Sequence, residues 1–150
     1  MNPLFLSALF GAAKGAAAPG HQLSGSDAFQ AYVMAPLSEE AVYRAAPAFM
    51  GFPRGLSALT FAVDHLVSDS RRQPFVSGYH AATRFADVFA GGLLYEAAYR
   101  RWGFLGAALT HAMHNIMVGV GSRASGALGL RPAVAQAPHR LHRLRVKRRG

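Results

Sequence analysis

The longest uncharged stretch of the chain runs from Trp102 to Ser122 and holds no Asp, Glu, Lys or Arg in twenty-one residues. A helix of about 20 apolar residues is long enough to cross the ~30 Å hydrocarbon core of a bilayer. The stretch therefore predicts a transmembrane helix. We expect an all-α, polytopic membrane bundle of about four helices, and the alternative is a set of buried helices in a soluble domain.

The length of the chain limits it to one domain, and the uneven charge sets off a basic C-terminal tail. With 150 residues it forms one domain at most, and the lack of cysteine excludes disulfides and thiolate metal sites. The formal charge of +9 is uneven, because seven of the sixteen Lys and Arg lie in the last twenty residues. We expect an N-terminal apolar segment and linker at 1–27, a membrane-embedded core at 28–122 and a basic cytoplasmic tail at 123–150.

The distribution of positive charge predicts an orientation in the membrane. If the tail lies inside, together with Lys14, Arg71, Arg72, Arg84 and Arg123, twelve basic residues are inside and four are outside. Cytoplasmic loops carry the excess of Lys and Arg in membrane proteins. Both termini are therefore expected to be cytoplasmic.

One charged cluster interrupts the apolar first half of the chain, in the segment Pro36-Leu-Ser-Glu39-Glu40-Ala-Val-Tyr-Arg44. Glu40 and Arg44 stand four residues apart, where an acid before a base is the favourable order on a helix. Charges in apolar surroundings are costly unless they are paired. Glu39 has no partner nearby in the sequence, which makes it the first candidate for chemistry.

The rest of the chain is predicted to be helical in pieces. Pro36 is expected to stop or kink a first helix, Ser38 to begin a new one, and Pro47 and Pro53 to end that helix. Further helices are expected at 55–67 and 84–101, with a polar loop at 68–83 between them. Gly103 separates the second of these helices from the long apolar one.

Two of the predicted helices carry polar residues in apolar surroundings. In the helix at 55–67, His65 lies one turn after Phe61, and in the long apolar helix, Asn115 lies one turn after His111. A lone histidine on an apolar helix is more often a core residue than a catalyst, and a Glu/Arg pair is usually structural. The ordered set of three pairs is more informative than any one of them.

The patterns EExxxR, FxxxH and HxxxN occur in this order and resemble those of the CPBP family, the CAAX proteases and bacteriocin-processing enzymes also called the Abi family. The likeness covers roughly 28–121. The family comprises polytopic intramembrane endopeptidases that depend on a glutamate and are often grouped with the metalloproteases. The resemblance implies a protease core at 28–122, in an integral membrane protein that we expect in the bacterial inner membrane.

Carried over by motif position, the resemblance also implies roles for single residues. Glu39 would be the base that activates water, and His65 would polarise or hold that water. His111 and Asn115 would donate hydrogen bonds to the oxyanion of the tetrahedral intermediate. The supporting residues would be Glu40, Arg44 and Phe61. Amide hydrolysis needs such a base, a held water and preorganised donors.

The cofactor and partners follow from the same resemblance. We expect no metal; in the alternative, Glu39, His65 and His111 would form a zinc set, with His114 as a spare ligand, although HExxH is absent. The expected partners are the lipid bilayer and a membrane-embedded or membrane-anchored peptide, such as a prenylated C-terminus, a leader or a sorting tail. No nucleic acid is expected.

Two other functions stay open. One is a non-catalytic membrane scaffold or immunity protein with the same fold. The other is a binder of anionic surfaces or nucleic acid that uses the basic tail, for which a cytoplasmic anchor is the simpler interpretation.

Overall fold

The computed structural model describes residues 2–17, 25–53, 55–72, 75 and 77–128. In these residues all regular structure is helical, which confirms the all-α prediction. The elements are α1 (Pro3–Ala17), α2 (Gly25–Phe29), η1 (Gln30–Met34), α3 (Ala35–Glu40), η2 (Ala41–Ala45), α4 (Ala46–Phe49), α5 (Leu56–Arg72) and α6 (Gly78–Ala127). Most of the predicted basic tail lies outside the described residues.

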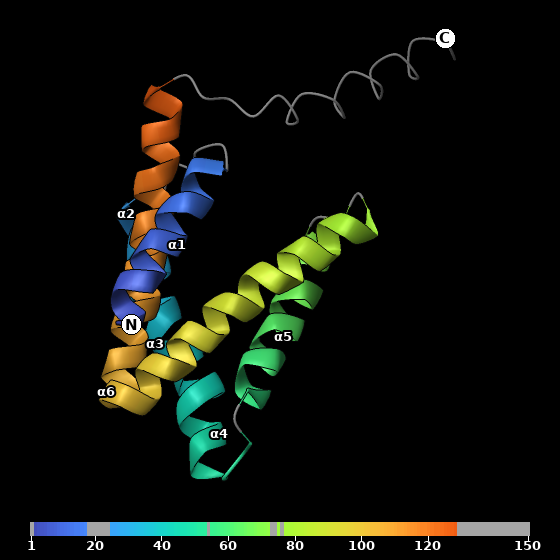
Figure 1. Ribbon diagram of the computed structural model, residues 1–150, viewed down its shortest axis with the longest axis vertical. Helices are drawn as coiled ribbons and strands as arrows, with labels where there is room; N and C mark the ends of the chain where they lie inside the picture. The colour runs from blue at the N-terminus through green and yellow to red at the C-terminus, as the bar shows by residue number, and fades with distance from the viewer. Residues whose placement is uncertain (1, 18–24, 54, 73–74, 76, 129–150) are drawn as a thin grey trace.

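Helix α6 consists of two arms that meet at Gly103 and form a V (Figure 1). Gly103 has φ 71° and ψ −166°, a conformation that glycine adopts readily and other residues avoid. The predicted separation of two helices at this glycine is therefore confirmed. The chain between α5 and α6 is shorter than predicted, because α5 continues to Arg72 and the first arm begins at Gly78, where the Ser77 side chain caps the His80 N–H.

The segment from α2 to α4 is one continuous helical run interrupted by two wide π-helical turns, η1 and η2. Pro36 and Pro47 each stand in the first turn after one of these segments, where the missing N–H of proline is tolerated. The predicted break at Pro36, with a restart at Ser38, is therefore wrong. The run ends at Phe49 through Gly51, which has φ 71°.

Helix α1 packs directly against the second arm of α6 (Figure 1). A Cβ atom on Gly11 or Gly15 would collide with the backbone of His114 or Val118, so the two helices approach closely. Ser7 Oγ adds a hydrogen bond to the Thr110 carbonyl at 3.1 Å. The position of α1 along the arm is fixed by this close contact.

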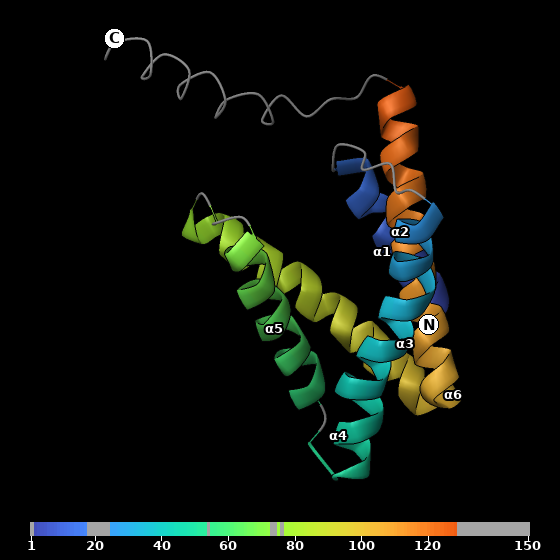
Figure 2. The same ribbon diagram turned by 180° about the vertical axis from the view of Figure 1, so that it is seen from behind.

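The remaining helices pack along the two arms of α6. Figure 2 shows α5 beside the first arm, and α2 and α3 alongside the second. Both carboxylate oxygens of Glu96, on the first arm, accept the Gly55 N–H at 3.1 Å and so hold the start of α5. A small core of Phe61, Ala62, Val88 and Tyr95 joins α5 to the first arm.

None of the described helices combines the length and the apolar character needed to cross a membrane. The transmembrane helix predicted at Trp102–Ser122 is therefore not borne out. The stretch is uncharged, but His111, His114 and Asn115, together with its glycines, lower its mean hydropathy. The absence of charged residues alone is therefore a weaker indication of a membrane-spanning helix than high hydropathy is.

Candidate active site

Arg44 connects three parts of the fold from a buried position. Its side chain is 1% exposed and that of Glu40 0%, and Arg44 Nε lies 3.5 Å from Glu40 Oε2. Arg44 Nη1 donates to Ser57 Oγ at 2.8 Å, and Nη2 donates to the Gly92 carbonyl at 3.1 Å. Burial lowers the pKa of Arg44, and the negative charges of Glu40 and Glu96 oppose that shift. The pair thus ties the α2–α4 run to α5 and to the first arm of α6.

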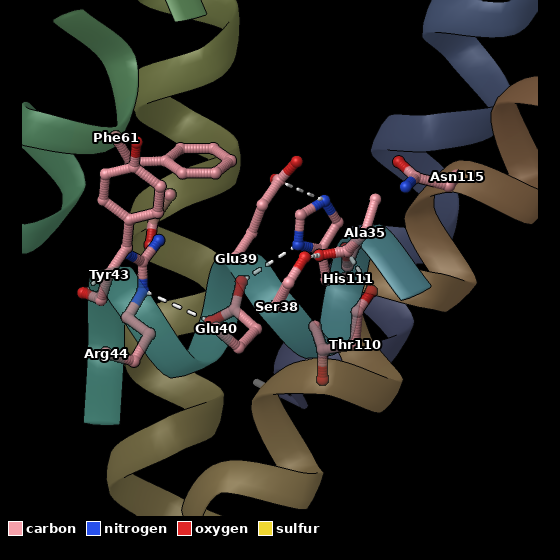
Figure 3. A network of polar contacts seen from close by, with 12 residues as sticks. Ala35, Ser38, Glu39, Glu40, Tyr43, Arg44, Phe61, Thr110, His111 and Asn115 are labelled. Carbon is pink, nitrogen blue, oxygen red and sulfur yellow. Dashed lines mark hydrogen bonds and ion pairs between the residues drawn. The ribbon is translucent and has the colours of Figure 1, made fainter. Parts of the chain in front are cut away.

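Glu40 also contacts His111, which sequence reasoning did not anticipate. His111 Nδ1 donates to Glu40 Oε1 at 2.9 Å (Figure 3). The ring is thereby oriented with Nε2 toward Glu39, whose Oε2 lies 3.7 Å away. Glu40 and His111 are 71 positions apart, and no local pattern in the sequence could have paired them.

His65 approaches Glu39 from α5. The Phe61 carbonyl lies 2.9 Å from His65 Nδ1, and because a carbonyl only accepts, Nδ1 carries the hydrogen. His65 Nε2 is then turned toward Glu39 Oε2, at 3.6 Å. The Phe61 ring lies against His65, with centroids 4.2 Å apart, and edge-on to His111 at 5.8 Å. The FxxxH spacing therefore sets both the tautomer and the position of His65.

Glu39 Oε2 is the atom on which the two imidazoles converge. It is buried and has no hydrogen-bond partner among the described residues. A neutral His65 whose Nδ1 hydrogen is donated to the Phe61 carbonyl presents Nε2 as an acceptor, and the Glu39 carboxylate is an acceptor too. Two acceptors that face each other need a shared donor, and water is the smallest one.

A cavity of about 150 Å³ brings the predicted catalytic residues together. All four line it: Glu39, His65, His111 and Asn115. The Asn115 amide nitrogen donates to the Ala31 carbonyl in η1 at 2.9 Å, which orients the side chain. Figure 3 shows Asn115 on the same arm of α6 as His111.

Tyr95 and His114 also line this cavity; Tyr95 was missed, and His114 was considered only as a spare zinc ligand. Tyr95 stacks on His111, with ring centroids 4.2 Å apart and an interplanar angle of 12°. Burial raises the pKa of Tyr95 well above its usual range, so the hydroxyl stays protonated. His114 is buried with no partner for Nδ1 among the described residues, and burial lowers its pKa to about 4. The stacking of Tyr95 on His111 joins the two arms of α6 across the turn at Gly103, so no sequence periodicity reveals it.

Tyr43, inside the first motif, makes a second connection to α5. Its hydroxyl donates to Asp64 Oδ2 at 2.7 Å. Burial and this hydrogen bond raise the pKa of Tyr43 to about 12. The contact holds the motif beside His65, the neighbour of Asp64 in the chain.

The metal alternative depends on Glu39, His65 and His111 acting as one ligand set. In the part of the chain that the structure describes, no group of three or more His, Cys, Asp or Glu side chains is arranged to hold a metal ion. The chemistry of the three side chains suits zinc.

Comparison with known proteins gives a family. Residues 23–117 match the family described as type II CAAX prenyl endopeptidase Rce1-like. The match covers more than half of the chain, includes all three motifs and confirms the resemblance drawn from them. No curated protein and no solved structure shows significant similarity to the chain. The chain therefore belongs to the Rce1-like family of type II CAAX prenyl endopeptidases, a family of proteases.

Proposed function

We propose that this protein is an endopeptidase that cleaves a prenylated, membrane-associated peptide by means of a glutamate-activated water. The observation that carries the proposal is the placement of Glu39. Its buried Oε2 has no hydrogen-bond partner in the part of the chain that the structure describes, and it lies at a cavity wall, 3.6 Å from His65 Nε2 and 3.7 Å from His111 Nε2. The prenylated substrate is taken from the description of the family.

In the proposed first step, Glu39 removes a proton from a water held beside it. His65 Nε2 accepts a hydrogen bond from the other O–H of that water, because its Nδ1 donates to the Phe61 carbonyl, and this second hydrogen stays on the oxygen. The oxygen attacks the carbonyl carbon of the peptide, and the carbonyl electron pair moves to its oxygen. A positioned base contributes roughly 10²- to 10⁴-fold to such a step.

The oxyanion is proposed to lie between Asn115 and His111. One hydrogen of the Asn115 amide is used by Ala31, and the second is available to the cavity. His111, when Nε2 carries a proton, offers a second donor. When the intermediate collapses, the C–N bond breaks, and Glu39 returns its proton to the leaving amine.

Glu40 and Arg44 are proposed to act through His111 rather than on the substrate. Glu40 fixes which nitrogen of His111 faces the cavity, and Arg44 holds Glu40. This geometry agrees with the supporting role that the first motif implies for the pair.

We place the activity at a membrane on a separate observation. Large apolar side chains are exposed on α1 and on the second arm of α6, at Phe5, Leu9, Leu105 and Leu109. Contiguous exposed apolar surface typically marks an interaction with protein or membrane. Co-sedimentation of the protein with phospholipid vesicles tests this placement, and protein that stays in the supernatant would contradict it.

The activity is tested with a short farnesylated peptide that ends in a CAAX sequence. The purified protein is incubated with this peptide or with its unprenylated twin, and the products are identified by mass spectrometry. We expect internal cleavage of the prenylated peptide and little cleavage of the twin. If neither peptide is cleaved by a folded protein, the proposed activity is wrong. Equal cleavage of both peptides would show that the enzyme does not recognise the prenyl group.

A further inference from the structure

Two cations line the same cavity as Glu39. Lys14 comes from α1, and Arg84 comes from the first arm of α6. Both approach one oxygen, Asp87 Oδ2, with Lys14 Nζ at 2.7 Å and Arg84 Nη1 at 3.1 Å. Lys14 lies outside residues 23–117, so it is a feature of this chain beyond the part that matches the family.

The contacts of Lys14 and Arg84 with described residues use only some of their N–H donors. An ammonium has three donors and a guanidinium five. Among the described residues, Lys14 is paired with Asp87 alone, and Arg84 is paired with Asp87 and, through Nε at 2.6 Å, with Asp69. Both side chains are partly exposed and lie at the cavity, so the remaining donors are available to a ligand.

The position of Lys14 is fixed by the packing of α1. Gly11 and Gly15 flank it and lie against the backbone of the second arm of α6, at His114 and Val118. Close backbone contact on both sides of Lys14 prevents the helix from sliding or rotating freely. The cation is therefore held at the cavity by the fold, with only its side chain able to move.

We propose that Lys14 and Arg84 bind the free α-carboxylate of the peptide substrate. The inference rests on the proposed function. Lysine and arginine are the side chains that recognise carboxylates, and arginine does so through paired hydrogen bonds. The other charged groups lining the cavity are the carboxylates of Glu39 and Asp87, which repel an anion. Lys14 and Arg84 thus decide whether a peptide end bearing a negative charge enters.

The proposal accounts for how a peptide cut a short distance from its own C-terminus, such as the CAAX peptide of the proposed function, is recognised. The carboxylate would be held near the base, and the scissile bond would be brought to Glu39 in the same small cavity. A long chain continuing past the cut offers no carboxylate to these cations. Lys14 and Arg84 therefore serve as specificity-determining residues for cleavage near a chain end.

The test uses two peptides that differ only in a C-terminal carboxylate or carboxamide. Binding of each to Glu39→Gln protein is measured by fluorescence anisotropy, so that the result does not depend on turnover. We expect the carboxamide to bind about tenfold more weakly, as for the loss of a charge-assisted hydrogen bond. In Lys14→Gln, Glu39→Gln protein, the carboxylate peptide should bind as weakly as the carboxamide.

Matched variants separate recognition from a structural role of Lys14. Lys14→Arg keeps the charge and should restore the preference for the carboxylate. Arg101→Gln removes the same charge from an exposed position outside the cavity lining and should keep the preference. If Lys14→Gln does not fold, Arg84→Gln is measured in its place, with the same expected loss of preference.

Three results would overturn the proposal. Equal binding of the two peptides to protein with Lys14 intact is the first. Equal weakening of both peptides by Lys14→Gln is the second, since it would show a role in the fold only. The third is retention of the carboxylate preference in Lys14→Gln. Failure of the endopeptidase activity would appear separately, as uncleaved peptide in the mass-spectrometric assay.

Discussion

Glu40 accepts a hydrogen bond from Nδ1 of His111 at 2.9 Å, although the two residues lie on helices far apart in the sequence. Glu40 thereby joins the first motif of the chain to the third. Its other oxygen faces Arg44 at 3.5 Å, so one buried carboxylate serves both a cation and an imidazole. Adjacent glutamates consequently have different tasks, with Glu39 at the cavity and Glu40 behind it.

Glu40→Gln should lower both stability and activity. Arg44 and His111 lose their charged partner in a buried place, which we expect to cost roughly 3 kcal/mol in the free energy of unfolding. His111 also loses the acceptor that fixes its orientation, so kcat should fall even in the folded fraction. Denaturant unfolding and peptide hydrolysis, measured on the same preparation, test this. Unchanged values in both would show that the pair is dispensable.

Replacing Tyr95 should separate stacking from hydrogen bonding at His111. The ring of Tyr95 lies parallel to the imidazole, with centroids 4.2 Å apart. Tyr95→Phe keeps the ring and should retain most of the activity, whereas Tyr95→Leu should lower kcat about three- to tenfold. The test is a comparison of the steady-state kcat of the two variants with that of the parent. A loss in Tyr95→Phe as large as in Tyr95→Leu would assign the effect to the hydroxyl.

His114 should make the protein less stable as the solution becomes acidic. Burial lowers its pKa to about 4 from the usual 6.5, so the unfolded chain binds a proton that the folded protein excludes. Stability from this group is complete above about pH 6.5 and is lost as the pH falls toward 4, by about 3 kcal/mol. His114→Gln should flatten the curve of unfolding free energy against pH over that interval. Parallel curves for variant and parent would contradict the assignment.

The sequence predicted the polar residues of the site better than the elements that carry them. The i,i+4 spacing of Phe61 with His65 and of His111 with Asn115 predicts each pair on one face of a helix, and all four residues line the same cavity. The hydrogen bond from His65 to the Phe61 carbonyl was not predicted. Gly103 also acts as predicted. These features are local, and local spacing can be read from a sequence.

Contacts between segments far apart in the sequence could not be predicted. The Glu40–His111 bond, the stacking of Tyr95 and the approach of Lys14 to Asp87 depend on how the arms of α6 meet the other helices. The break expected at Pro36 did not occur, because the proline stands in the first turn after the π-helical turn η1, whereas the run ends at Phe49, between Pro47 and Pro53, as expected. Proline is a probable helix boundary rather than a certain one.

Exhaustive treatment with a strong chelator should leave the activity intact. We propose that Glu39 activates the water directly, so no metal is required for the step. Hydrolysis is compared before chelation, after it, and after zinc is added back. Loss of activity that zinc restores would make Glu39, His65 and His111 ligands and a metal-bound hydroxide the nucleophile.

Asn115→Ala should slow the reaction without abolishing it. Removal of one oxyanion donor costs roughly 3 to 4 kcal/mol in the transition state, or about a hundred- to thousandfold in kcat. KM should change little, because the oxyanion exists only during the reaction. A change in KM with kcat preserved would place Asn115 in substrate binding.

Substitution of Glu39 by glutamine tests the central claim most directly. Glu39→Gln keeps the size of the side chain and removes the base, and the measurement is single-turnover cleavage of the prenylated peptide by protein whose unfolding midpoint matches the parent. We predict a rate about a hundred- to ten-thousandfold lower, with peptide binding retained. Cleavage within about tenfold of the parent would contradict a glutamate-activated water and favour a scaffold that binds without cutting.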